Sequence, residues 1–245
     1  MGEKRIGGTA SPGMNCRRLL VHVEGPTEET FVNEVLAMHL LAKGYEKVDA
    51  RLLGNARLRS HRGGICSWSS ARRDVVKHLR QDQRCLATTL VDYYGLPQTG
   101  EGAWPGRAQA SSQGTPSEKA LCVEHALVEN LAQDIDARRF IPFVIMHEFE
   151  GWLFSDVSAF SRGIGRPDLE RKFGAIRNSF NTPEHINDSL TNAPSKRIQN
   201  LVPSYQKPLY GVLAILEIGM ARIREECPQF AGWLKRLESL VGSEI

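Results

Sequence analysis

The sequence predicts an α/β fold in which a mostly parallel sheet is flanked by helices. Apolar, partly β-branched segments at 19–23, 85–91 and 139–146 are typical of buried strands. A further strand is expected at 48–53, between two segments with helical periodicity. Strands that alternate with helices over short connections favour right-handed crossovers, and such crossovers place the strands parallel to one another.

The first strand leads directly into a helix. It stops at Glu24, where Gly25 and Pro26 suit the cap and first position of a helix that runs to about Lys43. Glu28 follows in the first turn of that helix. An acidic residue at this place favours a helix N-terminus without any further role. Glu24 has no capping role, and its carboxylate is costly to bury without a partner, which indicates a functional site.

Acidic residues also follow the other two apolar strands. Asp92 ends the strand at 85–91, and Glu148 and Glu150 come just after the last predicted strand. The carboxyl ends of parallel strands meet at one edge of a sheet, where open α/β folds bind ligands. We therefore expect these carboxylates to gather near the end of the first strand. His147 beside them suits either a metal ligand or, more commonly, a hydrogen-bonded structural residue.

Positive charge collects between residues 54 and 77. The candidate residues for binding a nucleic-acid backbone are Arg57, Arg59, Arg62, Arg72 and Arg73. Clustered arginines of this kind can neutralise phosphates independently of base sequence. A solvated loop and helix face is an equally good interpretation of the same charges.

The chain is expected to divide into three regions. Residues 1–15 predict a Gly-rich flexible tail, 16–160 the α/β core, and 161–245 a helical elaboration packed on that core. Residues 98–115 are rich in Gly, Ser, Pro and Gln and predict a long loop without fixed structure, with Trp104 as its anchor.

The C-terminal region has apolar residues at helical spacing in two segments, 209–223 and 230–241. We expect these helices to cover the sheet edge or to form an interaction surface. Leu213, Leu216 and Met220 are assigned to the core in preference to a partner groove.

Composition narrows the class of protein. The net charge of +3 is compatible with a nucleic-acid partner without requiring one. Five scattered cysteines without a CxxC pair argue against a zinc site and a disulfide framework. No apolar run is long enough to span a bilayer, and the first residues lack the hydrophobic segment of a secretory signal. The expected location is the cytoplasm, with no membrane partner.

Four motifs carry a family resemblance. VEGPTEE, VDYYG, HEFEGWLFSD and PSKRI, in this order and strand context, resemble the small Toprim-like proteins of domain-of-unknown-function family 4276. They resemble more loosely the nuclease half of OLD-type ATPase-nucleases. The resemblance covers roughly residues 17–205 and implies a Toprim-like α/β fold that binds divalent metal for phosphodiester chemistry.

The resemblance also implies roles for particular residues. Glu24 and Glu28 match a strand-end glutamate and a second acid one turn later, and Asp92 matches the acid of a later strand. A further acid matches Glu148 or Glu150. The set of implied metal ligands is Glu24, Glu28, Asp92, Glu148 and Glu150, and the implied catalytic residues are Glu24 and Lys196.

One position departs from the Toprim pattern. Many Toprim domains carry two aspartates separated by one residue, whereas this chain has Tyr94 in the second place after Asp92. Hard oxygen ligands without paired Cys or His suit Mg²⁺ or Mn²⁺. The expected cofactor is therefore one or two of these ions, with the second ion in doubt.

The expected function is a divalent-metal-dependent nuclease that acts on DNA, with RNA not excluded. The resemblance implies a role in defence against phage or mobile DNA with a separately encoded ATPase partner. A homo-oligomer is compatible with the sequence. The alternative is a catalytically weak Toprim module that binds nucleic acid or an ATPase as a sensor or regulator.

Overall fold

The computed structural model describes residues 17–54, 65–187 and 191–241, and the statements below concern these ranges. The predicted tail at 1–15 and three of the predicted phosphate-binding arginines lie outside them. Those arginines are Arg57, Arg59 and Arg62.

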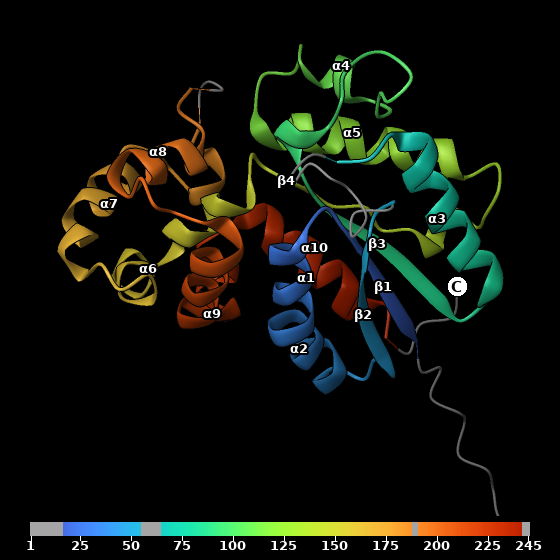
Figure 1. Ribbon diagram of the computed structural model, residues 1–245. Helices are drawn as coiled ribbons and strands as arrows, with labels where there is room; N and C mark the ends of the chain where they lie inside the picture. Colours follow the sequence, from blue (N-terminus) through green and yellow to red (C-terminus); the bar gives the residue numbers. More distant parts are fainter. Residues whose placement is uncertain (1–16, 55–64, 188–190, 242–245) are drawn as a thin grey trace, which may run out of the picture.

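The described chain contains a four-stranded, all-parallel sheet flanked by helices, which confirms the predicted α/β fold class and is consistent with a Toprim-like fold (Figure 1). The strand order is β2-β1-β3-β4. The strands are β1 (Arg18–Val23), β2 (Lys47–Leu52), β3 (Cys85–Asp92) and β4 (Val144–Ile145). Because β1 lies in the middle of the order, its carboxyl end is next to those of both β2 and β3.

One face of the sheet is covered by elements from both ends of the chain. These are α1 (Pro26–Phe31), the π-helical turn η1 (Val32–Leu36), α2 (Ala37–Ala42) and α10 (Pro228–Ser239). Trp233 of α10 is buried and donates its indole N–H to the Thr88 hydroxyl of β3 at 3.0 Å. The C-terminal helix α10 is therefore a layer on the sheet face and does not lie at the sheet edge.

The other face is covered by α3 (Trp68–Gln81) and α5 (Pro116–Leu131). The start of α5 has a capping box formed by Thr115 and Glu118. The cap of α3 is Ser67, whose hydroxyl accepts a hydrogen bond from the Ser70 amide.

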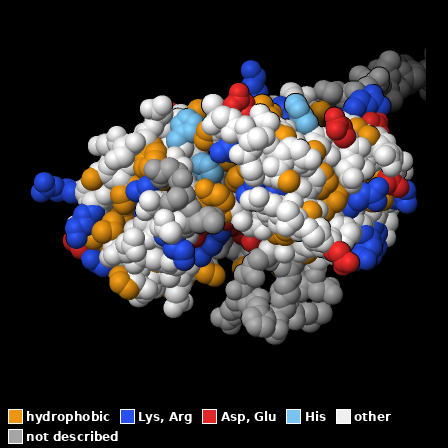
Figure 2. Space-filling model, turned by 90° about the horizontal axis from the view of Figure 1, so that it is seen from above, with side chains coloured by type: hydrophobic (Ala, Val, Ile, Leu, Met, Phe, Trp, Pro, Cys, Tyr) orange, Lys and Arg blue, Asp and Glu red, His pale blue; other side chains and the backbone are white. Residues whose placement is uncertain are grey.

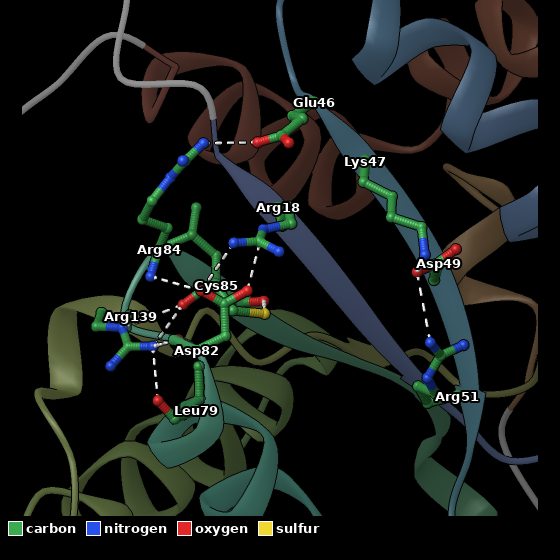
Figure 3. Close-up of polar contacts among 11 residues, drawn as sticks. Arg18, Glu46, Lys47, Asp49, Arg51, Leu79, Asp82, Arg84, Cys85 and Arg139 are labelled. Carbon is green, nitrogen blue, oxygen red and sulfur yellow. Dashed lines mark hydrogen bonds and ion pairs between the residues drawn. The ribbon is translucent and has the colours of Figure 1, made fainter.

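The last predicted strand is shorter than expected. Only Val144–Ile145 pair as β4, whereas the prediction spanned 139–146. Arg139 is instead buried and donates to the carbonyls of Leu79 and Cys85 at 2.9 Å (Figure 3). These bonds fix the amino end of β3, where Cys85 lies. Between Arg139 and β4 the pairing with β3 is irregular. The Ile141 amide donates to the Ala87 carbonyl at 2.9 Å, and the Thr88 and Thr89 hydroxyls make further bonds to the backbone of 141–143.

Residues 98–115 have more structure than the sequence indicates. They include the short helix α4 (Arg107–Ala110), and Trp104 is buried with its indole N–H bonded to the Cys66 carbonyl. The buried Arg107 guanidinium lies 3.8 Å from the centre of the Tyr93 ring and also donates to the Tyr93 carbonyl. These contacts explain why a Gly- and Ser-rich segment is fixed on the strand β3.

The C-terminal region forms a helical lobe beside the sheet (Figure 1). It comprises 3-10 segments η5 (Phe149–Ser155), η6 (Pro167–Leu169) and η7 (Pro183–His185), helices α6 (Val157–Gly163), α7 (Glu170–Arg177), α8 (Pro194–Leu201) and α9 (Val212–Glu226), and the π-helical turn η8 (Lys207–Gly211). Its core is continuous with that of the sheet, so the lobe packs on the α/β core. At the α6–α9 contact a Cβ on Gly163 would lie 2.8 Å from the Ala214 Cα, which requires glycine there.

The core assignment of Leu213 and Leu216 is wrong. These side chains are 45% and 47% exposed, because α9 turns Ala214, Ile215 and Ile218 inward instead. Met220 is partly buried and does pack on the core. No helix among the described residues is long and apolar enough to cross a membrane.

Candidate active site

The carboxyl ends of the strands carry a cluster of acidic side chains. Glu24 follows β1 directly, and Glu28 lies in the first turn of α1, where it is only 2% exposed. Gly25 is in an extended conformation, and Pro26 begins the helix, so the chain reverses without moving the two glutamates apart. The predicted convergence of the Glu24 and Glu28 carboxylates at the strand end is therefore present, with each raising the local negative charge felt by the other.

Asp92 enters the same cluster from the end of β3. One carboxylate oxygen, Oδ1, accepts the Phe149 amide at 2.8 Å, and this bond joins the end of β3 to the start of η5. The other oxygen, Oδ2, accepts a hydrogen bond from the Lys207 ammonium at 3.0 Å. Asp92 is thus held in one orientation by a backbone donor while its second oxygen faces the centre of the cluster.

Glu148 and Glu150 have different positions although they are two residues apart. Glu150 is buried in η5, and its Oε2 lies 3.4 Å from the Lys207 ammonium. Glu148 accepts the backbone amide of Ser195 at 3.0 Å, in the first turn of α8. The structure therefore brings Glu150 to the cation at the centre of the cluster and uses Glu148 to fix α8.

Lys207 is the cation of the cluster. Its Nζ lies 3.0 Å from Glu28 Oε1, 3.0 Å from Asp92 Oδ2 and 3.4 Å from Glu150 Oε2. It begins η8, the turn that leads into α9. Three carboxylates from three separate elements therefore share one ammonium group.

The expected contact of Lys196 with the carboxylates is not formed. Lys196 is exposed on α8, and its Nζ donates to the neighbouring Gln199 side chain at 3.3 Å. The sequence analysis did not predict Lys207, although its place in the chain offers a signal. Lys207 precedes Pro208 at the start of a helical segment, where the helix dipole disfavours a positive charge unless a partner is present.

The cluster has more acidic groups than cations. Burial is the main cause that raises the pKa of Glu24 to about 7, against the opposing effect of Lys207. Burial likewise raises the pKa of Asp92 well above its ordinary value and raises that of Glu150. Although burial alone lowers the pKa of Lys207, the carboxylates of Asp92, Glu150 and Glu28 outweigh it and raise that pKa well above its usual range. The Lys207 ammonium is therefore charged. One ammonium does not balance the negative charge of the four carboxylates if all of them are ionised.

Glu24 has an unused ligand atom. Its Oε2 is buried and has no hydrogen-bond partner among the described residues. A Cβ at Gly95 would lie 2.9 Å from this atom, so the glycine leaves the space in which the carboxylate sits. A buried, unpaired carboxylate oxygen is costly unless a cation or donor completes it.

The chemistry of the donors fits a hard divalent cation. Carboxylate oxygens are the ligands that Mg²⁺ and Mn²⁺ prefer, and the free Glu24 oxygen offers such a ligand. As they stand, however, no three acidic, His or Cys side chains in the described ranges form a group that could hold a metal ion. The Lys207 ammonium lies between three of the carboxylates, so these residues fit a metal only after a rearrangement around that ammonium.

A match to a protein-family model shows to which family the chain belongs. The model for the domain of unknown function DUF4276 matches residues 23–238. The chain belongs to the DUF4276 family. No curated protein and no solved structure matches it. The match includes every member of the carboxylate cluster and Lys207, so these residues lie within the DUF4276 domain itself.

Next to the cluster of this DUF4276 chain, Tyr94 stacks on His147. The two ring centres are 5.3 Å apart, and the Tyr94 amide donates to the His147 carbonyl at 3.4 Å. His147 is buried in this stack, and both interpretations of this histidine stay predictions. The Tyr94 ring, two residues after Asp92, therefore has a packing role.

The predicted phosphate-binding arginines of this DUF4276 chain are described only in part. Arg72 donates to Asn130 at 3.0 Å and forms an ion pair with Asp134, so it joins α3 to the end of α5. Arg73 is exposed and makes a 3.3 Å contact with Ser70 on its own helix. Figure 2 views the molecule of Figure 1 from above. On this face basic side chains lie at several separate places, with acidic side chains beside some of them. The phosphate-binding role of these arginines stays a prediction.

Proposed function

We propose that this DUF4276 protein is a divalent-metal-dependent nuclease of the Toprim type that hydrolyses phosphodiester bonds, with DNA as the substrate and RNA not excluded. The observation that supports the proposal is the cluster of the half-buried Glu24 with the buried Glu28, Asp92 and Glu150 at the carboxyl ends of parallel strands. A chain that needs stability alone gains little from burying several carboxylates around one lysine, because their desolvation is costly. Buried clusters of ionisable groups with shifted pKa values are typical of functional sites.

Glu24, Glu28, Asp92 and Glu150 would hold the ion. Bound Mg²⁺ or Mn²⁺ supplies activation of a water molecule and neutralisation of charge on the phosphate. The Phe149 amide keeps the Asp92 carboxylate oriented through its 2.8 Å bond. The Lys207 ammonium has three donor hydrogens and lies at the partly exposed side of the cluster, where it can bind a phosphate oxygen.

The resemblance to Toprim and OLD-type nucleases adds a biological setting. It supports a cytoplasmic role in defence against phage or mobile DNA, together with a separately encoded ATPase. The mildly basic net charge of +3 is compatible with a DNA substrate. A homo-oligomer is a further proposal of the same kind, and each is open to direct measurement.

A catalytically weak Toprim module is the second candidate function. The observation that favours it is the Lys207 ammonium, which already pairs with three of the carboxylates. In this alternative the cluster is a permanent ion-pair network, and the protein binds nucleic acid or an ATPase as a sensor or regulator.

A plasmid-nicking assay distinguishes the two candidates. Supercoiled DNA is incubated with the full chain in Mg²⁺, in Mn²⁺ and in EDTA, and nicked product is measured. The nuclease proposal predicts cleavage that EDTA abolishes and that Glu24→Gln and Asp92→Asn each reduce at least ~100-fold while the fold is kept. Glu34→Gln, on the exposed side of the first helical segment, is the matched control and should cut like the parent.

Unchanged cleavage by both site variants would show that the carboxylate cluster is not the active site. Binding of duplex DNA without cleavage in either metal would favour the regulatory alternative.

A further inference from the structure

The position of Lys207 has a consequence for how many metal ions the site can take. This inference rests on the proposed function, because it concerns the same carboxylates. The ammonium is 31% exposed, whereas the side chains of Glu28, Asp92 and Glu150 are 3%, 11% and 3% exposed. Lys207 therefore lies over the carboxylates on their solvent side and contacts all three at once.

The ammonium and a metal ion cannot share this point. The nitrogen lies 3.0 Å from oxygens of Glu28 and Asp92, which is the spacing of charged hydrogen bonds. Mg²⁺ requires oxygens at about 2.1 Å, so the same carboxylates would have to move inward by about 1 Å to bind it. A divalent cation and an ammonium at the same centre would also repel each other strongly in this buried setting.

One ligand atom lies outside the ion pairs of Lys207. The Glu24 carboxylate has no ion pair with Lys207 at ion-pair distance, and its buried Oε2 has no hydrogen-bond partner among the described residues. Tyr94, two residues after Asp92, adds no carboxylate to the cluster, and its ring is stacked on His147. The ammonium therefore occupies the point between Glu28, Asp92 and Glu150, and among the described carboxylates of the cluster that of Glu24 lies outside its ion pairs.

We propose that Lys207 takes the place of one metal ion, so that the chain binds one divalent ion fewer than its carboxylates would otherwise hold. The ammonium supplies the positive charge of the missing ion to the cluster. In this arrangement Lys207 is a built-in cation, delivered by η8 to carboxylates on α1, β3 and η5.

The test is the number of Mn²⁺ ions bound per chain, measured by equilibrium dialysis and by the loss of the free Mn²⁺ signal in electron paramagnetic resonance. Lys207→Met is expected to bind one Mn²⁺ more than the parent. Lys207→Arg keeps the positive charge and should bind the same number as the parent. Lys196→Met is the matched control on the exposed face of α8 and should also leave the number unchanged.

Loss of the ammonium leaves buried carboxylates unpaired, so the metal-free Lys207→Met protein is expected to melt at a lower temperature than the parent. A second pair of variants keeps the test decisive if that protein does not fold. Glu150→Gln removes one of the carboxylates, and the double variant Lys207→Met/Glu150→Gln should bind one more Mn²⁺ than Glu150→Gln alone.

Equal numbers of bound ions with and without the Lys207 ammonium, in both pairs, would overturn the proposal. The count of ions does not depend on cleavage. A parent protein that binds one Mn²⁺ but cuts no nucleic acid would therefore contradict the proposed nuclease function and leave the role of Lys207 intact.

Discussion

The Lys207 ammonium lies 3.0 Å from Asp92 although the two residues are 115 positions apart in the chain. The contact joins the end of the central strand β3 to the turn η8, which begins the run into α9. The C-terminal lobe therefore supplies both the cation and Glu150, while the α/β core positions the Glu28 and Asp92 carboxylates. The lobe is part of the candidate site as well as a packing element.

The two glutamates that the sequence could not separate should differ in their effects. Glu150 contacts the central ammonium, whereas Glu148 binds the Ser195 amide. We expect Glu150→Gln to reduce metal-dependent cleavage at least ~100-fold, because it removes a ligand charge from the cluster. Glu148→Gln should cost about 1 kcal/mol of unfolding free energy or less, because it only weakens a charge-assisted bond to an amide. Single-turnover rates and urea unfolding of both variants check this, and equal rate losses would contradict the assignment.

The stability of the protein should depend on pH through Glu184. Its two carboxylate oxygens accept the Gln229 and Phe230 amides at 2.9 Å, which fixes the start of α10. Burial raises the pKa of Glu184 to about 7, although these amide bonds act to lower it. The folded state thus holds the proton more tightly than the unfolded state, so this contribution to stability is present below about pH 4.5 and is lost as the pH rises to about 7.

Urea unfolding of the parent and of Glu184→Gln between pH 4.5 and 7.5 measures this effect. The parent should lose more stability over this range than the variant, with a difference on the order of 3 kcal/mol at most. Comparing the two proteins separates Glu184 from the carboxylates of the active-site cluster, which titrate in both. Parallel stability curves would show that Glu184 does not titrate in this range.

The two described arginines of the predicted phosphate-binding set should also behave differently. Arg72 is held by Asn130 and Asp134, so Arg72→Gln should lower stability by about 1 kcal/mol and affect DNA binding only indirectly. Arg73 is exposed, and Arg73→Gln should leave stability unchanged while reducing the salt dependence of DNA binding by about one phosphate contact. Affinity measured at several salt concentrations checks the second expectation, and an unchanged salt slope for Arg73→Gln would remove this residue from the binding surface.

The sequence was most informative where local patterns decide the structure. Strand periodicity followed by a turn placed Glu24 and Asp92 at strand ends, and the parallel sheet then brought them to the same edge. It was least informative where a distant segment completes a contact. Nothing near Lys207 in the sequence shows which carboxylates it contacts. The packing of the lobe on α1 determines that Lys207, and not Lys196, reaches the carboxylates. Helical spacing likewise shows that α9 has an apolar side, but residues 212–216 are apolar all round and do not show which side faces inward.

The last prediction concerns Gly95, which lies against the Glu24 carboxylate. An added Cβ would lie 2.9 Å from Glu24 Oε2, closer than such contacts normally are. The atom that it meets is the end of a flexible side chain, so Gly95→Ala should displace the carboxylate and leave the backbone in place. We expect at least ~10-fold weaker Mn²⁺ binding with a change of about 1 kcal/mol or less in unfolding free energy. Gly174→Ala in α7 is the matched control, because nothing lies within 4 Å of its added Cβ, and it should bind Mn²⁺ like the parent. Equal Mn²⁺ affinity for Gly95→Ala and the parent would show that the Glu24 oxygen is not a metal ligand.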